Sequence, residues 1–318
     1  MTLSTDEIQT ALGIDVSQDS VTLFDSATGQ TLTIANDADA LEVALGPLRD
    51  RDLAICEATG GHEDRLLAVL YALGIRAHRA DAAKVKAYIR SFGKRAKTDA
   101  IDARWLARYA IDRAPALARW QPPQACQAEI ETLVARRLDL VAMKSQEQNR
   151  LKAPRGHRIA NDIADHIAEL QARIEAIEIR IDTLIAQNSD FTIRATALRS
   201  VPGIGPVLAP LLIATMPELG SINRRQAASL AGCAPHPKDS GKLNAHRHTS
   251  GGRHQIKPAL FIAALAAARG SNPLADFYKT LLHAGKPKRL ALAAVMRKII
   301  TIANARIRDA FNLKSQLT

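Results

Sequence analysis

Four acidic side chains in the first third of the sequence are candidates for a metal site. Asp15 interrupts the apolar stretch "LGIDV", and Glu57 directly follows the apolar run "LAIC". Asp99 and Asp102 stand three residues apart in "KTDAIDARWLA", so a helix there carries both on one face. Carboxylates held close together repel unless a divalent cation joins them. Their hard oxygen atoms suit Mg²⁺ or Mn²⁺, with phosphate oxygens completing the coordination shell.

The surroundings of these acids favour a site over solvated surface charge, which is the more common role of any single acid. Asp15 and Glu57 belong to apolar segments, and the Asp99 and Asp102 pair follows "SFGKRAK", a basic loop suited to a nucleic-acid backbone. Glu63 and Asp64 are expected on an exposed helical turn and are left out of the set.

A second candidate segment is "HPKDSGKLNAHRHTSGGRH", residues 236–254, which surrounds two serines with glycine and positive charge. A serine in such a loop is either a nucleophile or a residue that caps a turn. A zinc cluster is a weaker alternative because no cysteine pair accompanies the four histidines. These histidines are His236, His246, His248 and His254.

The elements that must position the acids follow from periodicity. Short apolar runs predict strands at 12–16, 20–25, 31–35, 52–58 and 75–80. Amphipathic patterns predict helices at 37–48, 61–74, 82–90 and 97–111. The resulting order βββαβαβα is that of the RNase H-like fold, a mixed sheet with helices on its faces. In this fold Asp15 and Glu57 lie on neighbouring strands.

The pattern breaks at Pro122 and Pro123, a plausible domain boundary, and two long helical stretches follow. The second carries a heptad seam of isoleucine and leucine. Its members are Ile163, Ile167, Leu170, Ile174, Ile177, Ile181 and Leu184. The seam needs a partner helix, either the preceding helix folded back or another copy of the chain; periodicity does not decide between them.

The last third is helical and punctuated by glycine. "VPGIGPVLA" joins two apolar helices, either as a helix-hairpin-helix whose turn amides hold a backbone phosphate or as a tight turn between packed helices.

Composition limits the class of protein. The 318 residues favour two or three domains, and 43 lysines and arginines against 32 acids give a net charge of +11, which favours a polyanionic partner such as DNA or RNA. Three scattered cysteines suggest neither disulfides nor structural zinc. No signal segment or membrane-spanning run is evident, so we expect a cytoplasmic protein without a membrane partner.

These motifs together resemble one known family. "GIDVS", "CEATGGHE", "RAKTDAIDARWLARYA", "VPGIGPVLA", "LAGCAPHPKDSGK", "SGGR" and the segment around "GKPKR" occur in the order found in DEDD transposases of the insertion-sequence one-ten family, Coxiella-type subgroup. Relatives include the Piv invertase and the bridge-RNA-guided serine recombinases. The resemblance covers nearly the whole chain.

The resemblance implies an α/β plus α fold in three parts. These are a RuvC-like (RNase H-like) DEDD domain over 1–118, a helical coiled-coil region over 119–190 and a mainly helical transposase domain over 191–318, with the helix-hairpin-helix-like turn. It implies that Asp15, Glu57, Asp99 and Asp102 are the catalytic, metal-binding acids, with Mg²⁺ or Mn²⁺ as cofactor. The family's nucleophile in its "DSG" motif corresponds to Ser240, with Gly241 allowing close approach of the nucleic-acid backbone.

Ser250 is the competing serine, but the family does not keep serine at that position. One departure is "LNAHRH", where relatives usually have a glycine flanked by arginines; this puts the local loop geometry and phosphate contacts in doubt. The residues expected to contact guide RNA or DNA backbones are Lys94, Arg95, Lys97, Gly241, Arg253, Lys286, Lys288 and Arg289.

The implied function is that of a DNA recombinase that moves an insertion element through a phosphoserine intermediate. The implied partners are donor and target DNA, a bridge RNA encoded by the element, and further copies of the chain in a dimer or tetramer held by the coiled coil. The acids and the serine would then meet in a composite site. The alternatives are a RuvC-like nuclease or junction resolvase that uses water, a catalytically silent nucleic-acid-binding remnant, and site-directed DNA inversion.

Overall fold

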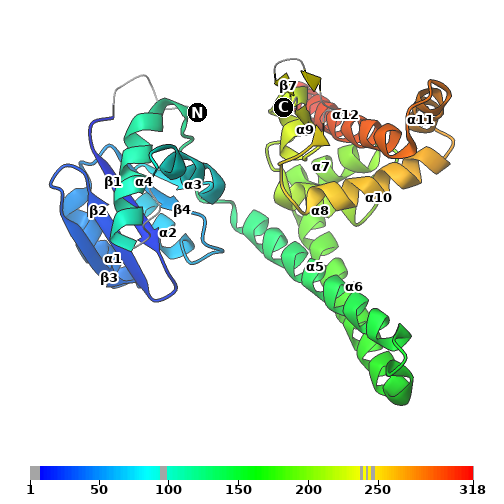
Figure 1. The fold of residues 1–318 in the computed structure, drawn as a ribbon, viewed down its shortest axis with the longest axis horizontal. Helices are drawn as coiled ribbons and strands as arrows, with labels where there is room; N and C mark the ends of the chain where they lie inside the picture. Colours follow the sequence, from blue (N-terminus) through cyan, green and yellow to red (C-terminus); the bar gives the residue numbers. More distant parts are fainter. Residues whose placement is uncertain (1–7, 94–98, 237–238, 241–242, 245–247, 318) are drawn as a thin grey trace. The chain divides into compact units, whose positions relative to one another are not determined.

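A computed structural model of the chain describes residues 8–93, 99–236, 239–240, 243–244 and 248–317. At residue 317 and at the described positions within 236–248, it describes the backbone alone. The chain forms two compact units, Met1–Pro123 and Gln124–Thr318 (Figure 1). The division into parts at 1–118, 119–190 and 191–318 stays a prediction.

The first unit is a mixed α/β structure. Its strands are β1 (Ala11–Val16), β2 (Ser20–Asp25), β3 (Thr31–Ala35), β4 (Leu53–Glu57) and β5 (Ala77–Ala80). Its helices are α1 (Ala38–Leu45), α2 (Asp64–Ala72), α3 (Ala82–Ser91) and α4 (Asp99–Arg113), with short 3₁₀ turns at 46–48 and 114–116.

These strands form one sheet in the order β3-β2-β1-β4-β5. The first three strands pair antiparallel as a meander, while β4 pairs parallel with both β1 and β5. The order of elements confirms the βββαβαβα prediction, and the unit fits the RuvC-like fold.

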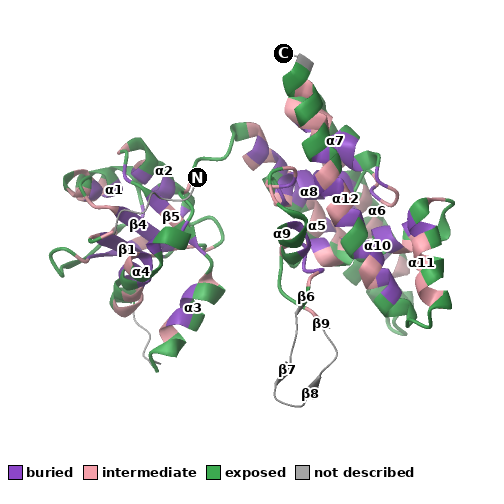
Figure 2. Cartoon of the chain, turned by 90° about the horizontal axis from the view of Figure 1, so that it is seen from above, coloured by how far each residue is buried: buried purple, intermediate pink, exposed green. Residues whose placement is uncertain are grey.

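The two faces of the sheet carry separate cores, because neighbouring residues of a strand point to opposite faces. One core packs Leu12 and Ile14 of β1 with side chains of α1 and α2. The other packs Ala11 of β1 and Ile55 of β4 with side chains of α3 and α4. Figure 2 shows buried residues on β1, β4 and the helices that cover them. Helices therefore cover both faces of the sheet.

The second unit is mainly helical. Its helices are α5 (Ala125–Lys152), α6 (Ala160–Gln187), α7 (Ser189–Arg199), α8 (Leu208–Thr215), α9 (Arg224–Leu230), α10 (Ile256–Arg269), α11 (Pro273–His283) and α12 (Lys288–Leu317). A short 3₁₀ turn occupies Gly156–Ile159. Four two-residue strands stand between α9 and α10: β6 (Pro235–His236), β7 (Asp239–Ser240), β8 (Leu243–Asn244) and β9 (His248–Thr249).

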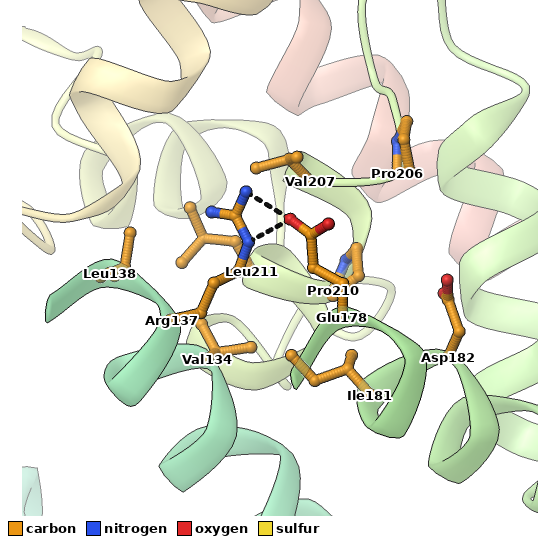
Figure 3. A pocket seen from close by; sticks show the side chains of 10 residues that line it. All are labelled: Val134, Arg137, Leu138, Glu178, Ile181, Asp182, Pro206, Val207, Pro210 and Leu211. Atoms are coloured by element: carbon orange, nitrogen blue, oxygen red, sulfur yellow. Dashed lines mark hydrogen bonds and ion pairs between the residues drawn. The ribbon is translucent and has the colours of Figure 1, made fainter. Parts of the chain in front are cut away.

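The helices α5 and α6 pack against each other as a hairpin (Figure 1). Leu140 of α5 lies in one cluster with Leu170 and Ile174 of the heptad seam. Arg137 of α5 and Glu178 of α6 form an ion pair at 2.6 Å beside a small apolar pocket (Figure 3). Of the two partners left open for the seam, the structure shows the preceding helix; a coiled coil between copies stays a prediction.

The remaining helices of the second unit share one large core. The turn after α7 packs tightly on α10, because a Cβ on Gly203 would overlap the carbonyl oxygen of Ala263. Gly203 also has a φ of +92°, which favours glycine. Close packing therefore accounts for this glycine of "VPGIGPVLA". In the described part of the chain, no helix has the length and apolar character needed to cross a membrane.

Candidate active site

Asp15 and Glu57 lie at the same edge and on the same face of the sheet. Because β1 and β4 run parallel with Ile14 opposite Cys56, the next residues, Asp15 and Glu57, stand side by side at the carboxyl ends of the two strands. Ile14 and Cys56 belong to the core under α1 and α2, so the alternation along each strand turns Asp15 and Glu57 toward the face covered by α3 and α4.

The direction of α4 brings its first turn to that edge. After α4 ends at Arg113, the chain returns to the start of β5, where the Trp120 N–H donates to the Ala77 carbonyl at 2.7 Å. Ala77 pairs with Ala54 near the amino end of β4, so the carboxyl end of α4 faces the amino ends of the parallel strands. The opposite end of α4, with Asp99 and Asp102, therefore faces the strand ends that carry Asp15 and Glu57.

The closeness of α4 to the sheet depends on Gly13. A Cβ at this position would overlap the Ala103 carbonyl oxygen and the Ala107 nitrogen, so α4 lies directly on the backbone of β1. Asp99 and Asp102 are in the first turn of α4, within four residues of Ala103, and Gly13 precedes Asp15 by two residues. Asp99 is exposed, and the other three acids are partly buried. The backbone thus gathers the four acid-bearing positions at one end of the unit.

The side chains as they stand do not form a ready coordination set. Among the residues that the structure describes, no group of three or more His, Cys, Asp or Glu residues is placed to hold a metal ion. The chemistry of the donors fits a hard cation, since all four side chains are carboxylates. The placement of the elements and the donor type are therefore suited to a divalent ion, but the side chains would have to converge on it.

Glu63 organises the loop that follows Glu57. Its carboxylate accepts hydrogen bonds from the Thr59 N–H at 3.1 Å, the Thr59 hydroxyl at 2.9 Å and the Gly61 N–H at 2.9 Å. Gly60 and Gly61 both have positive φ, which lets the loop fold around the carboxylate. Arg79 of β5 approaches the other carboxylate oxygen at 3.6 Å.

The prediction that Glu63 lies on an exposed turn is wrong, because Glu63 is only 2 % exposed. Burial opposes its ionisation, but hydrogen bonds from the backbone N–H groups and from Thr59 prevail and lower its pKa. Its neighbour Asp64 is exposed as predicted. The signal in the sequence was the glycine pair Gly60 and Gly61 shortly before Glu63, because glycines let a loop fold back around a nearby side chain.

An aromatic cluster joins α3 to α4. Tyr88 lies between Phe92, Trp105 and Tyr109, with ring centroids 5.1 to 6.2 Å apart. The Arg108 guanidinium lies 4.5 Å from the Phe92 centroid. These contacts hold together α3 and α4, the two helices that flank the 94–98 connection. Lys94, Arg95 and Lys97 of that connection lie outside the described residues.

Ser240 belongs to β7, which pairs antiparallel with β8 opposite Leu243. β6 pairs antiparallel with β9. The two strand pairs, β6 with β9 and β7 with β8, are here called the serine hairpin. Gly241 and His246 lie outside the described residues. For Ser240, His236 and His248 the structure describes the backbone but not the side chain. Ser250 and His254 are exposed just beyond the hairpin.

The base of the serine hairpin is a crossing of glycines. Gly232, Gly251 and Gly252 all have positive φ, between 67° and 76°. A Cβ on Gly252 would overlap the backbone of Gly232, so the entering and leaving chains touch. The Arg253 N–H also donates to the Leu230 carbonyl at 2.8 Å. The glycines of "SGGR" therefore hold the two ends of the hairpin together.

Arg253 is engaged within the second unit. Its guanidinium donates to both carboxylate oxygens of Glu218, at 2.5 and 2.8 Å, and to the Thr215 carbonyl. The side chain thus anchors the hairpin to the end of α8, and a phosphate contact would have to be made in addition to these bonds. Lys286 is exposed in the loop before α12, and Lys288 and Arg289 are exposed at the start of α12.

Comparison with known proteins agrees with this arrangement. Residues 12–154 match a DEDD-type IS110 family model described as a transposase, and residues 195–279 match one described as "Transposase IS116/IS110/IS902 family". The first match covers the sheet and extends through α5. The second match covers the region around the serine hairpin.

Similar proteins include two that are named for DNA inversion. The pilin gene-inverting protein of Moraxella lacunata is 30% identical over 260 residues, 80% of each chain, and that of Moraxella bovis has the same identity and coverage. The IS110 43.6 kDa protein of Streptomyces coelicolor is 26% identical over 161 residues, covering 50% of this chain and 39% of that protein. These matches show that the chain belongs to the IS110 family of insertion-sequence transposases and is a DNA transposase or recombinase.

Proposed function

We propose that this recombinase cuts and rejoins DNA strands through a phosphoserine intermediate, with Ser240 as the nucleophile and a divalent ion held by Asp15, Glu57, Asp99 and Asp102. The observation that carries the proposal is the placement of the four acids. Strand register sets Asp15 beside Glu57, and the contact of α4 with Gly13 sets Asp99 and Asp102 at the same end of the sheet.

The ion would be Mg²⁺ or Mn²⁺. When bound, such an ion stabilises negative charge on a phosphoryl group. Two strands and one helix would bring the carboxylates to the ion. The hydrogen bonds from Thr59 and Gly61 to Glu63 fix the backbone that follows Glu57.

The serine chemistry conserves bond energy. The Ser240 oxygen loses its proton to a base and bonds to the phosphorus of a phosphodiester, and the bond from that phosphorus to one sugar oxygen breaks. One strand end is then linked to the protein, and the other is released as a hydroxyl that takes up a proton. Attack by a hydroxyl from another strand reverses the step and restores the serine, so rejoining needs no ATP.

The partners we propose are donor and target DNA together with a bridge RNA encoded by the element. Base pairing with the RNA would select sequences, while the protein contacts backbone and shape. Exposed Lys286, Lys288 and Arg289 are suited to phosphate contacts. We propose a dimer or tetramer through the α5 and α6 region, acting in the cytoplasm. The names of the Moraxella relatives favour inversion of a DNA segment as a second outcome of the same chemistry.

Strand cleavage by purified protein tests the acid site. Asp99→Asn and Asp102→Asn should each remove Mg²⁺-dependent nicking of a plasmid carrying the element, while Asp39→Asn, an exposed acid of α1, should leave it intact. Nicking that persists in both variants would refute the metal site. Sequencing RNA that co-purifies with the wild type tests the guide: a single enriched RNA from the element supports it, and random cellular RNA counts against it.

A further inference from the structure

A pocket of 230 Å³ lies at the base of the serine hairpin. Cys233 and Pro235 line it from the chain entering the hairpin, and Thr249 lines it from the chain leaving it. The other wall comes from α11, the following loop and one face of α12. It consists of Leu281, Lys286, Leu290, Ala291, Ala293, Ala294 and Arg297.

This pocket combines an apolar floor with a cationic rim. Alanine and leucine side chains of α12 line it, and Leu290 is 51% exposed there. Lys286 and Arg297 are also in the lining, and none of the lining side chains that the structure describes is a carboxylate. Lys257 adds a third positive charge, since its ammonium donates to the Thr249 carbonyl at 2.9 Å. A nucleotide has the complementary chemistry, because the apolar face of its base is flanked by negatively charged phosphates.

The electrostatics of Cys233 indicate that these cations act on the pocket wall. Burial raises the pKa of the Cys233 thiol to about 11, while the positive charges of Lys257 and Arg297 oppose the shift. An anion at the rim would therefore meet positive potential from Lys257 and Arg297.

The pocket is also within reach of the proposed nucleophile. Ser240 is the fifth residue after Pro235, and an extended chain rises ~3.4 Å per residue, so the separation is at most about 17 Å. A DNA strand held at the pocket can therefore continue to the serine.

We propose that this pocket binds one unstacked base of the DNA strand that Ser240 cleaves, with Lys286 and Arg297 on the flanking phosphates. The inference rests on the proposed function and adds to it a base-binding subsite. Contact with the aliphatic side chains removes apolar area of the base from water, at about 25 cal/mol per Å². Burial of roughly 50 Å² corresponds to a preference of about tenfold.

Binding of defined probes to the full-length protein tests this subsite. Fluorescence anisotropy would compare a short oligodeoxythymidylate, the same oligomer with every base removed, and an oligouridylate. The wild type should bind the first about tenfold more tightly than the abasic probe, because the base adds apolar contact area. Ala294→Phe, which fills the pocket, and Leu290→Ala, which truncates an exposed floor residue, should remove that preference; Leu313→Ala, at a 61% exposed leucine of α12, should not.

Charge is tested with a matched pair on α12. Arg297→Ala should weaken binding of the oligodeoxythymidylate more than Lys298→Ala, because the Lys298 ammonium lies over the Phe277 ring at 3.9 Å and outside the pocket lining. Equal weakening by both variants would indicate general attraction by a basic surface and would contradict the subsite.

Two other results would overturn the proposal. One is equal affinity of the wild type for base-bearing and abasic probes, and the other is a tighter, pocket-dependent binding of oligouridylate, which would assign the pocket to RNA. These readouts need no strand cleavage. A protein that shows the base preference but forms no Ser240 adduct would retain the subsite and refute the phosphoserine mechanism, so the two failures are distinguishable.

Discussion

Gly13 of β1 lies directly against the Ala103 carbonyl of α4, with no room for a Cβ between them. This contact sets the distance between the strand that carries Asp15 and the helix that carries Asp99 and Asp102. In the proposed mechanism it determines whether carboxylates from the strand and the helix can reach one ion.

Gly13→Ala should therefore impair both stability and strand cleavage. The added methyl must push α4 away from the sheet, and such overpacking costs about 1–3 kcal/mol. Denaturant unfolding would measure the loss. Gly46→Ala is the control, because its Cβ meets nothing within 4 Å and its φ is −51°. Normal cleavage by Gly13→Ala would show that the contact does not set the acid site.

Glu63→Gln should lower strand cleavage without removing an acid of the proposed metal set. The neutral amide is a weaker acceptor for the three donors of the 59–61 loop, and we expect a loss of about 1–3 kcal/mol in the free energy of unfolding. Asp64→Asn removes the same charge from the exposed neighbour and should leave both cleavage and stability near wild type. In Glu63→Gln, cleavage activity should fall by more than the fraction of folded protein does. A loss of cleavage that only matches the loss of folded protein would show that Glu63 has a purely structural role.

The first unit should lose stability in acid through Asp25. Arg51 donates to both oxygens of this buried carboxylate at 2.9 Å and lowers its pKa, so the pair stabilises the fold above the carboxyl's unfolded pKa, about 3.9. That contribution is lost as the pH falls through the lower, folded pKa. Thermal unfolding against pH would show the decline. Asp25→Asn should flatten it below pH ~4 and cost about 3 kcal/mol near neutral pH, since Arg51 loses its buried partner and keeps only the exposed Asp50. An unchanged acid slope in Asp25→Asn would exclude this carboxyl as the cause.

Gly252→Ala should disturb the serine hairpin. Its φ is +76° and its Cβ would overlap Gly232, so the two chains at the base of the hairpin must separate. We expect loss of covalent protein–DNA adducts at temperatures where the rest of the unit stays folded by circular dichroism. Gly285→Ala has a similar φ of +74° but open space around its Cβ, which separates the cost of the backbone conformation from that of the close contact. Adduct levels that fall equally in both variants would contradict a specific role for the crossing.

The strands, the order of elements and the edge that carries the acids could be predicted, because period-two and helical patterns are local and Asp15 and Glu57 break apolar runs. Glu63 was misplaced, since its burial depends on a loop that folds back and on Arg79 of a later strand. The sequence could not predict which helix packs on the α6 seam or that Arg253 binds Glu218. A sequence pattern identifies an apolar face or a charged residue, but not the distant residue that contacts it. What lies against Gly13 and Gly252 is likewise known only from the three-dimensional structure.

Covalent linkage of Ser240 to DNA can be measured directly. Protein incubated with Mg²⁺, its co-purified RNA and plasmid carrying the element would be denatured and resolved on a gel, and the modified peptide identified by mass spectrometry. We expect an adduct on Ser240 in the wild type and in Ser250→Ala, and none in Ser240→Ala that still binds DNA. An adduct that persists in Ser240→Ala, or wild-type cleavage that leaves no DNA on the protein, would contradict the account.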